Sequence, residues 1–225
     1  DWAVDEAARK GLPLHIIHAF SPDYPLTSIR FGYSTDRLRE LAVKVRTDSI
    51  LRARCAKPGV AITWDQPTSG PAAALVRASE TADTLVVGAQ GMGAAREPLM
   101  GSVSAQVAGH AHCPVVVIHK SPTPAPAEAP VVVGVDGSAS STNAIAYAFE
   151  QASSRGVGLT VVHGWWVEYA EGASASWIPT VDWQMFAQED QALVAESLTG
   201  WREKYPDVTV RRHSCLLYTS PSPRD

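Results

Sequence analysis

The chain has 225 residues, of which 45% are hydrophobic, and a formal net charge of −4. This length and apolar content suffice for one large or two ordinary globular domains. Acidic and basic residues are interspersed along the sequence, which argues against the basic surface typical of nucleic-acid-binding proteins.

The sequence also argues against a membrane or secreted protein. No apolar run approaches the about 20 residues of a membrane-spanning helix, and no signal peptide opens the chain. The three cysteines, Cys55, Cys113 and Cys215, are too scattered for a disulfide framework. We therefore expect a cytoplasmic protein with no nucleic-acid or membrane partner.

The first half of the chain alternates strand-like and helix-like segments. Apolar runs predict strands over 12–20, 60–64, 84–87 and 114–118, and apolar residues at helical spacing predict helices over 36–56, 71–81 and 102–111. Near-continuous apolar strands that alternate with helices are typical of a parallel sheet covered on both faces. The pattern therefore predicts an α/β fold.

A stiff linker follows. Residues 121–130, SPTPAPAEAP, alternate proline and alanine, a composition that favours an extended spacer. We expect it to separate one domain over 1–120 from a second over 131–214.

The second domain repeats the first. Trp2 aligns with Tyr147, the Lys10-Gly11 pair with Arg155-Gly156, and Ile16-Ile17-His18 with Val161-Val162-His163. After a longer loop in the second copy, Pro58 aligns with Pro206. This is the signature of a tandem duplication.

The alignment predicts that both copies are incomplete. The second copy opens with VVVGVDGSASSTNAIAYAF over 131–149, and the counterpart of this segment would lie before residue 1. Conversely, the second copy has no counterpart of residues 66–120. Residues 215–225 show no helix or strand pattern and resemble the translation of a sequencing adapter, so we assign them no function.

A glycine-rich segment joins the strand over 84–87 to the helix over 102–111. Its spacing is Gly88-x2-Gly91-x9-Gly101-Ser102. Glycines allow backbone N–H groups to approach an anion closely, and a helix N-terminus adds partial positive charge. Ser102 stands where we expect the helix N-cap. The alternative interpretation is that these glycines only form a tight turn.

Two motifs resemble the universal stress protein family. TLVVGAQGMGAAREPLMGSVS followed by HCPVVVIHK resembles the family's phosphate loop, fourth helix and fifth strand, and VVVGVDGS resembles its first strand. The resemblance covers roughly residues 1–214. It implies two tandem, doubly wound parallel-sheet domains, Rossmann-like and of the adenine nucleotide alpha hydrolase-like type, each incomplete.

The resemblance also implies a ligand and the residues that hold it. The expected ligand is ATP, with or without Mg, bound through Gly88, Gly91, Gly101, Ser102 and Val103. The residue that matches the family's adenine-contacting aspartate is Asp136, in the other copy. Alternatively, Asp136 or Ser138 only caps the helix that follows.

Three functional hypotheses remain at this stage. The first is an ATP-binding regulatory module in stress response, not a dedicated catalyst. Any ATP hydrolysis is expected to be slow, because the sequence shows no P-loop lysine and no positioned base. The second is a nucleotide-independent interaction module that pairs its tandem domains, or a homodimer, through the last strand over 114–118. The third is an adenylating or ATP-cleaving enzyme.

Several polar and aromatic residues have a structural interpretation as well as a functional one. His110, His112 and Cys113 form a cluster without the paired spacing of a zinc site, so we expect no metal. His18 and His163 recur at equivalent positions, as expected of packed histidines. Four tryptophans close together in the second copy form either a local core or a contact surface: Trp165, Trp166, Trp177 and Trp183.

Overall fold

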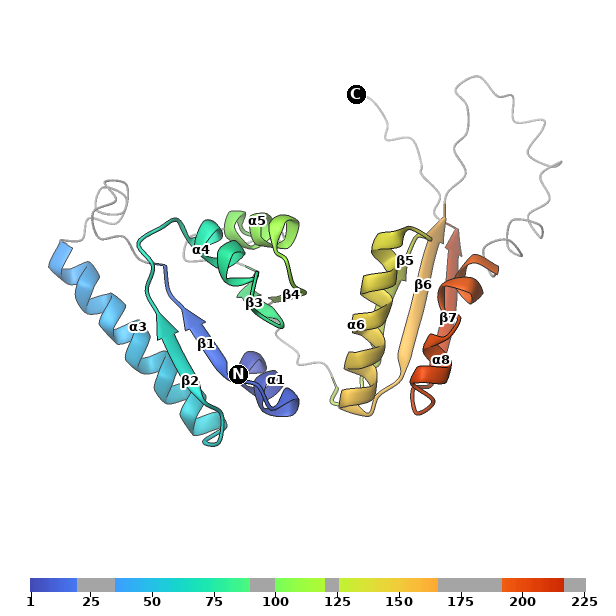
Figure 1. Cartoon of the computed structure of the whole chain (residues 1–225), viewed down its shortest axis with the longest axis horizontal. Coiled ribbons are helices and arrows are strands. Elements are labelled where there is room, and N and C mark those ends of the chain that lie inside the picture. The colour runs from blue at the N-terminus through green and yellow to red at the C-terminus, as the bar shows by residue number, and fades with distance from the viewer. Residues whose placement is uncertain (20–34, 90–99, 120–125, 166–191, 217–225) are drawn as a thin grey trace, which may run out of the picture. The chain divides into compact units, whose positions relative to one another are not determined.

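The computed structural model describes residues 1–19, 35–89, 100–119, 126–165 and 192–216. The chain divides into two compact units, Asp1–Pro122 (unit 1) and Thr123–Asp225 (unit 2). In both units parallel strands alternate with helices (Figure 1), which confirms the α/β class. The linker over 121–130 stays a prediction, since residues 121–125 lie outside the described residues.

Unit 1 contains four helices and four strands among its described residues. The helices are α1 (Trp2–Lys10), α3 (Thr35–Ala56), α4 (Pro71–Ala78) and α5 (Ser102–His110), and the strands are β1 (Leu14–Ile17), β2 (Ile62–Asp65), β3 (Leu85–Gly88) and β4 (Val115–Ile118). The four strands and the helices α3, α4 and α5 lie where the apolar pattern predicts them. Among the described helices of the chain, none combines the length and apolar character needed to cross a bilayer.

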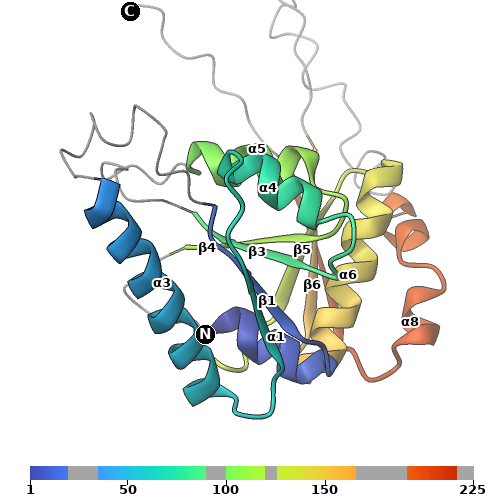
Figure 2. The same cartoon turned by 60° about the vertical axis from the view of Figure 1, so that its left-hand side comes forward.

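The strands of unit 1 form two separate parallel pairs. β1 pairs with β2, and β3 pairs with β4, but no ladder joins the two pairs among the described residues. α1 and α3 contact the β1–β2 pair, whereas α4 and α5 pack on each other and α5 contacts β4. Figure 2 shows α1 and α3 on one side of these strands and α4 and α5 on the other. The sheet of unit 1 is therefore covered on both faces but interrupted in its middle.

Unit 2 forms one three-stranded parallel sheet in the order β5-β6-β7. Its elements are β5 (Val131–Val135), α6 (Ala139–Arg155), β6 (Leu159–Trp165), α8 (Trp201–Lys204) and β7 (Val210–Leu216). α6 covers one face of the sheet, and its Ile145 and Phe149 are 1% and 0% exposed. They pack with Val133, Leu159 and Val161 into one apolar cluster.

The two units repeat the same backbone plan. α1 ends at Gly11 and α6 ends at Gly156, both with a left-handed φ of 65°. Only glycine adopts this conformation without steric cost, which makes it a frequent helix stop. The strand register agrees as well, because Leu14 lies opposite Ile62 and its counterpart Leu159 lies opposite Val210. The duplication read from the sequence is thus present in three dimensions.

The helix expected before β7 is interrupted. The sequence places Ala187, Val194, Leu198 and Trp201 on one helix face; Ala187 lies outside the described residues. The described helical segment spans 192–197, and Gly200, with φ 80°, separates it from α8. Trp201 nevertheless packs on the core, with its ring centroid 6.1 Å from that of Phe149.

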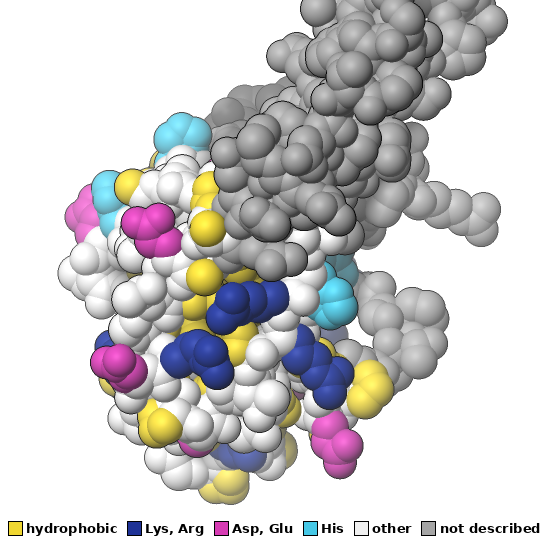
Figure 3. Space-filling view, turned by 90° about the vertical axis from the view of Figure 1, so that its right-hand side faces the viewer, with side chains coloured by type: hydrophobic (Ala, Val, Ile, Leu, Met, Phe, Trp, Pro, Cys, Tyr) yellow, Lys and Arg dark blue, Asp and Glu magenta, His cyan; other side chains and the backbone are white. Residues whose placement is uncertain are grey.

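In unit 2 a basic side chain lies over two aromatic rings. The Lys204 ammonium lies 5.3 Å from the ring centroids of both Trp201 and Tyr205. Figure 3 shows one face of the molecule, on which Lys and Arg side chains border apolar ones. In these cation–π contacts the Lys204 side chain covers the rings of Trp201 and Tyr205, and its charge stays exposed to water.

β7 is longer than the sequence pattern indicated. The apolar pattern predicts a strand over 208–212 and no helix or strand over 215–225. In the structure β7 continues to Leu216, because its backbone keeps pairing in parallel with Gly164 and Trp165 of β6. Residues 217–225 lie outside the described residues, so their assignment as an adapter sequence stays a prediction.

We predict that Phe149→Ala destabilises unit 2 strongly. Phe149 is fully buried, and its ring stacks on Trp201 and on Tyr205 at 5.7 Å. Removing a buried aromatic ring costs about 3–5 kcal/mol. Urea unfolding of the full chain measures the change. The control Val132→Ala, at a side chain 63% exposed, should change stability by no more than about 0.5 kcal/mol. Equal effects of the two variants would contradict the packing described here.

Candidate functional site

The predicted glycine loop begins and ends at one side of unit 1. Gly88 is the last residue of β3 and Gly101 precedes α5, whereas Gly91 lies in 90–99, outside the described residues. The Gly101 N–H donates to the Ala89 carbonyl at 2.6 Å, and the Ala89 N–H donates to the Ile118 carbonyl at 2.9 Å. The two ends of the loop are therefore joined to each other and to β4.

Ser104 reinforces this junction, and sequence reasoning missed it. Its side chain is 2% exposed, and its Oγ lies 3.1 Å from the Ala89 carbonyl oxygen and 2.9 Å from that of Gly101. The only signal in the sequence is a second serine two residues after Ser102. Because this buried hydroxyl bonds to the residues at both ends of the loop, it holds Ala89 and Gly101 at a fixed separation.

The helix cap lies one residue earlier than expected. The sequence places the N-cap of α5 at Ser102, but the structure places it at Gly101, whose carbonyl accepts the Ala105 N–H at 2.9 Å. Gly101 takes an extended conformation (φ −64°, ψ 159°) without a side-chain cap bond. Ser102 is thus the first helical residue, and its exposed hydroxyl is not used as a cap.

The start of α5 carries backbone N–H groups that have no backbone acceptor among the described residues. Among the described residues, no backbone bond uses the N–H groups of Ser102 and Val103. These N–H groups belong to the first turn, which has no intrahelical acceptors and carries partial positive charge. Gly88, Gly101, Ser102 and Val103 thus come together at the carboxyl ends of β3 and β4, the side of a parallel sheet where ligands bind.

Asp136 belongs to unit 2, whereas these four residues belong to unit 1. It directly follows β5, and its Oδ1 accepts the Ser138 N–H at 2.9 Å and the Ser141 hydroxyl. Gly137 makes this turn with φ 78°, and a Cβ there would lie 2.9 Å from Cδ1 of Leu193. Ser141 is the partner that the sequence did not reveal, since a serine in a first helical turn has no distinctive pattern.

These hydrogen bonds hold the carboxylate in its charged form. The bonds from Ser141 and Ser138 lower the pKa of Asp136 from an ordinary 3.8 to about 2. Ser138 is the N-cap residue of α6, but its own side chain makes no cap bond. Asp136 therefore orders the turn, and Oδ2 has no hydrogen-bond partner among the described residues.

His18 packs beside an aromatic ring, whereas His110 is exposed and bonds to its own helix. His18 follows β1, with its ring centroid 5.9 Å from that of Trp64, and burial lowers the pKa of His18. The Nδ1 of His110 bonds to the Gln106 carbonyl at 2.9 Å. Within the described ranges, no three metal-ligating side chains come together. Three of the four tryptophans singled out in the sequence, Trp166, Trp177 and Trp183, lie outside the described residues, as does Arg96 of the loop.

We predict that Asp136 titrates near pH 2 in the folded chain. Its pKa is depressed, so the stabilisation that its charge provides is complete above pH 4 and is lost as the pH falls from about 4 to about 2. An NMR titration of the carboxyl carbon measures the midpoint. Ser141→Ala should raise the pKa toward 3.8, because it removes the principal donor. A wild-type midpoint already near 3.8 would contradict the hydrogen-bond arrangement.

Comparison with known proteins identifies the family. The model of the universal stress protein family matches residues 1–119 and 129–215. Universal stress protein Rv2623 of Mycobacterium tuberculosis is 38% identical over 225 residues, which cover 94% of this chain and 72% of that protein.

One solved structure supports the fold, and a second is similar in sequence. A universal stress protein from Archaeoglobus fulgidus covers 96% of this chain and 71% of its own, with 18% identity and a TM-score of 0.59. A universal stress protein in complex with cAMP is 31% identical over 53% of this chain and 86% of its own, with a TM-score of 0.36. With two matched segments and relatives of this similarity, the chain belongs to the universal stress protein family.

Proposed function

We propose that this universal stress protein is a regulatory module that binds ATP, with or without Mg, through the loop between β3 and α5. Gly88, Gly91, Gly101, Ser102 and Val103 would contact the phosphates and ribose. Asp136 would contact adenine in a second, separate site of unit 2. The observation that carries the proposal is that the N–H groups of Ser102 and Val103 have no backbone acceptor among the described residues, next to the bonds that join Gly101 and Ser104 to Ala89.

The physical basis is the placement of donors. Phosphate oxygens require several N–H or O–H groups aimed at one point, and the first turn of α5 supplies N–H groups and the exposed Ser102 hydroxyl. The bonds from Gly101 and Ser104 to Ala89 hold this turn at the carboxyl end of β3. The donors therefore do not need to be ordered at the moment of binding, which favours affinity.

Regulation fits these residues better than catalysis. Rapid phosphoryl transfer needs a cation on the transferring phosphate and a group that positions the nucleophile. The glycine loop carries no Gly-Lys-Ser/Thr sequence. We therefore propose that nucleotide binding, rather than turnover, is the event that changes the protein's interactions in the cytoplasm during stress.

The first test measures ATP binding by calorimetry, with and without Mg, using the full chain. We predict a saturable heat for ATP that Gly101→Val reduces by about tenfold or more in affinity, because a β-branched side chain would stand at the N-cap where phosphate approaches. cAMP, the ligand of one solved relative, serves as the comparison ligand. An unchanged ATP isotherm for the variant would refute the role of the loop.

A matched serine pair separates binding from folding. Ser102→Ala removes an exposed hydroxyl and should weaken ATP binding by about tenfold with little change in stability. Ser104→Ala removes a buried hydroxyl bonded to the loop base and should lower the free energy of unfolding by about 1–3 kcal/mol. Calorimetry and urea unfolding on both variants check the two expectations. The reverse pattern would show that the serine roles are exchanged.

A second candidate function is association through β4. Among the described residues, β4 pairs only with β3, and Ile118 at its end is 38% exposed. An unpaired edge of this kind can add a strand from another domain or chain. Sedimentation of the full chain with and without ATP tests it, with Val117→Pro as the variant, because the Val117 N–H points away from β3 toward the free edge of β4. Association that is independent of ATP and lost in this variant would favour this function over nucleotide control.

A further inference from the structure

The long helix α3 has two different faces. On the inner face it contacts β2 and α1, and Leu38, Ala42 and Ala53 are buried, at 6%, 4% and 7% exposed. Figures 1 and 2 show α3 at the outside of unit 1, with no other described element of the unit beyond it. The outer face of a surface helix is normally polar. That of α3 carries exposed apolar side chains as well.

Five exposed side chains follow one another along this outer face. They are Glu40, Val43, Thr47, Leu51 and Arg54, called the outer stripe below. Steps of three or four residues keep successive positions on the same side of a helix, so the five lie in one row. The two apolar members are well exposed, Val43 at 64% and Leu51 at 53%. The outer stripe is thus an apolar centre with one acidic and one basic end.

The outer stripe is symmetric about Thr47. Its successive steps are three, four, four and three residues, so the spacing is the same in both chain directions. Reversal of the direction exchanges Val43 with Leu51, and Glu40 with Arg54. Each apolar side chain then meets an apolar one, and the carboxylate meets the guanidinium. A surface with this property is complementary to itself across a twofold axis.

The polar members of the outer stripe suit a contact with a second copy. The Arg54 guanidinium has no ion pair among the described residues, and Glu40 pairs with Arg37 of its own helix at 2.8 Å. The partner's Arg54 would therefore extend an existing pair into a network, which stabilises more than an isolated surface pair. The Thr47 hydroxyl donates to the Val43 carbonyl at 3.0 Å, so its hydrogen is already bonded when water is excluded.

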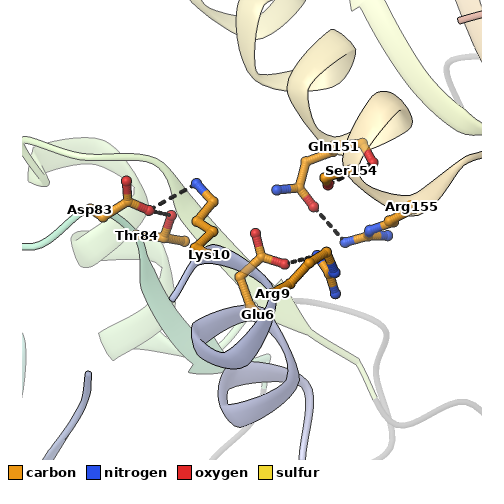
Figure 4. A network of polar contacts seen from close by, with 8 residues as sticks. All are labelled: Glu6, Arg9, Lys10, Asp83, Thr84, Gln151, Ser154 and Arg155. Atoms are coloured by element: carbon orange, nitrogen blue, oxygen red, sulfur yellow. Dashed lines mark hydrogen bonds and ion pairs between the residues drawn. The ribbon is translucent and has the colours of Figure 1, made fainter. Parts of the chain in front are cut away.

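The helix α1 differs from α3 in its charges. Lys10 Nζ of α1 lies 2.9 Å from Asp83 Oδ2, and Arg9 pairs with Glu6 (Figure 4). Cations that are paired within their own unit have less to gain from the carboxylate of a partner. Arg54 is left without such a pair in the part of unit 1 that the structure describes, which makes α3 the better contact surface.

We propose that α3 is a self-association surface, on which the outer stripe packs antiparallel against the same stripe of a second copy of this chain. The two Thr47 residues lie on the twofold axis. Val43 of each copy contacts the partner's Leu51, and Glu40 of each copy bonds to the partner's Arg54. The antiparallel arrangement also sets the two helix dipoles in opposite directions, which is favourable.

A second copy fits the outer stripe better than other partners. An acidic protein or an anionic membrane would be attracted by Arg54 but repelled by Glu40 at the other end of the row. The contact uses one helix of each chain and is smaller than a standard interface, so we expect a dissociation constant of about 0.1 mM. The surface shares no residue with β4 and needs no nucleotide.

The first test mixes two single variants of the full chain. Glu40→Arg alone sets guanidinium against guanidinium across the axis, and Arg54→Glu alone sets carboxylate against carboxylate. Each should weaken association by about tenfold or more. In an equimolar mixture the introduced arginine of one chain meets the introduced glutamate of the other, and the native Arg54 and Glu40 meet as well. The mixture should therefore associate as strongly as the wild type.

Sedimentation velocity without nucleotide measures this, over a concentration series that spans the expected dissociation constant. Weakening by both single variants together with recovery in the mixture supports the proposal. A wild-type chain that stays monomeric throughout the series overturns it, and so does a mixture that does not recover. Association through β4 alone would be the same in all samples, and that result also overturns the proposal. Since ATP is absent, a failure here leaves the nucleotide site untouched.

A second measurement locates the axis and decides the matter if a charge variant fails to fold. The three native cysteines are first replaced by serine. Thr47→Cys then places two thiols on the twofold axis, and mild oxidation should link the copies. The matched control is Val45→Cys, two residues away on another face of α3 and 40% exposed, which should give about tenfold less linked dimer. Equal yields from the two variants would overturn the antiparallel arrangement.

Discussion

Parallel strand pairing is the constraint on which the rest of this structure depends. Every ladder among the described residues is parallel, so each strand must be followed by a crossover before the next one begins. All carboxyl ends of one sheet then lie at the same edge. This is why Gly88 and Ile118 end together in unit 1, and why the turn at Asp136 stands at the corresponding edge of unit 2. Gly88 and Asp136 therefore lie at the carboxyl ends of their strands as a consequence of the parallel topology.

The duplication makes each unit a reference for the other. Gly11 and Gly156 stop equivalent helices with the same φ, and Leu14 and Leu159 have equivalent partners across the ladder. Because the two copies have the same order of elements, a difference in burial between equivalent strands indicates a difference in their neighbours. The half-buried β1 against the buried β6 is such a difference, and it locates the interruption in the sheet of unit 1.

Strand and helix positions could be predicted from the sequence because apolar periodicity and glycine stops are local signals. The α3 helix and the β3 strand lie within one residue of their predicted starts. Details that depend on tertiary bonds could not be predicted. Ser104 and Ser141 are ordinary serines in the sequence, and only the fold brings them to the Ala89 carbonyl and the Asp136 carboxylate. The break at Gly200 and the length of β7 depend in the same way on neighbours far along the chain.

The junction at Ala89 has a consequence for sequence variation. The Gly101 N–H and the Ser104 hydroxyl both reach the same carbonyl, so residues 90–99 leave and re-enter the scaffold at a fixed gap. The stability of β3 and α5 then depends more on Ala89, Gly101 and Ser104 than on the residues of 90–99. Substitutions or length changes within residues 90–99 should therefore leave the two bonds to the Ala89 carbonyl in place.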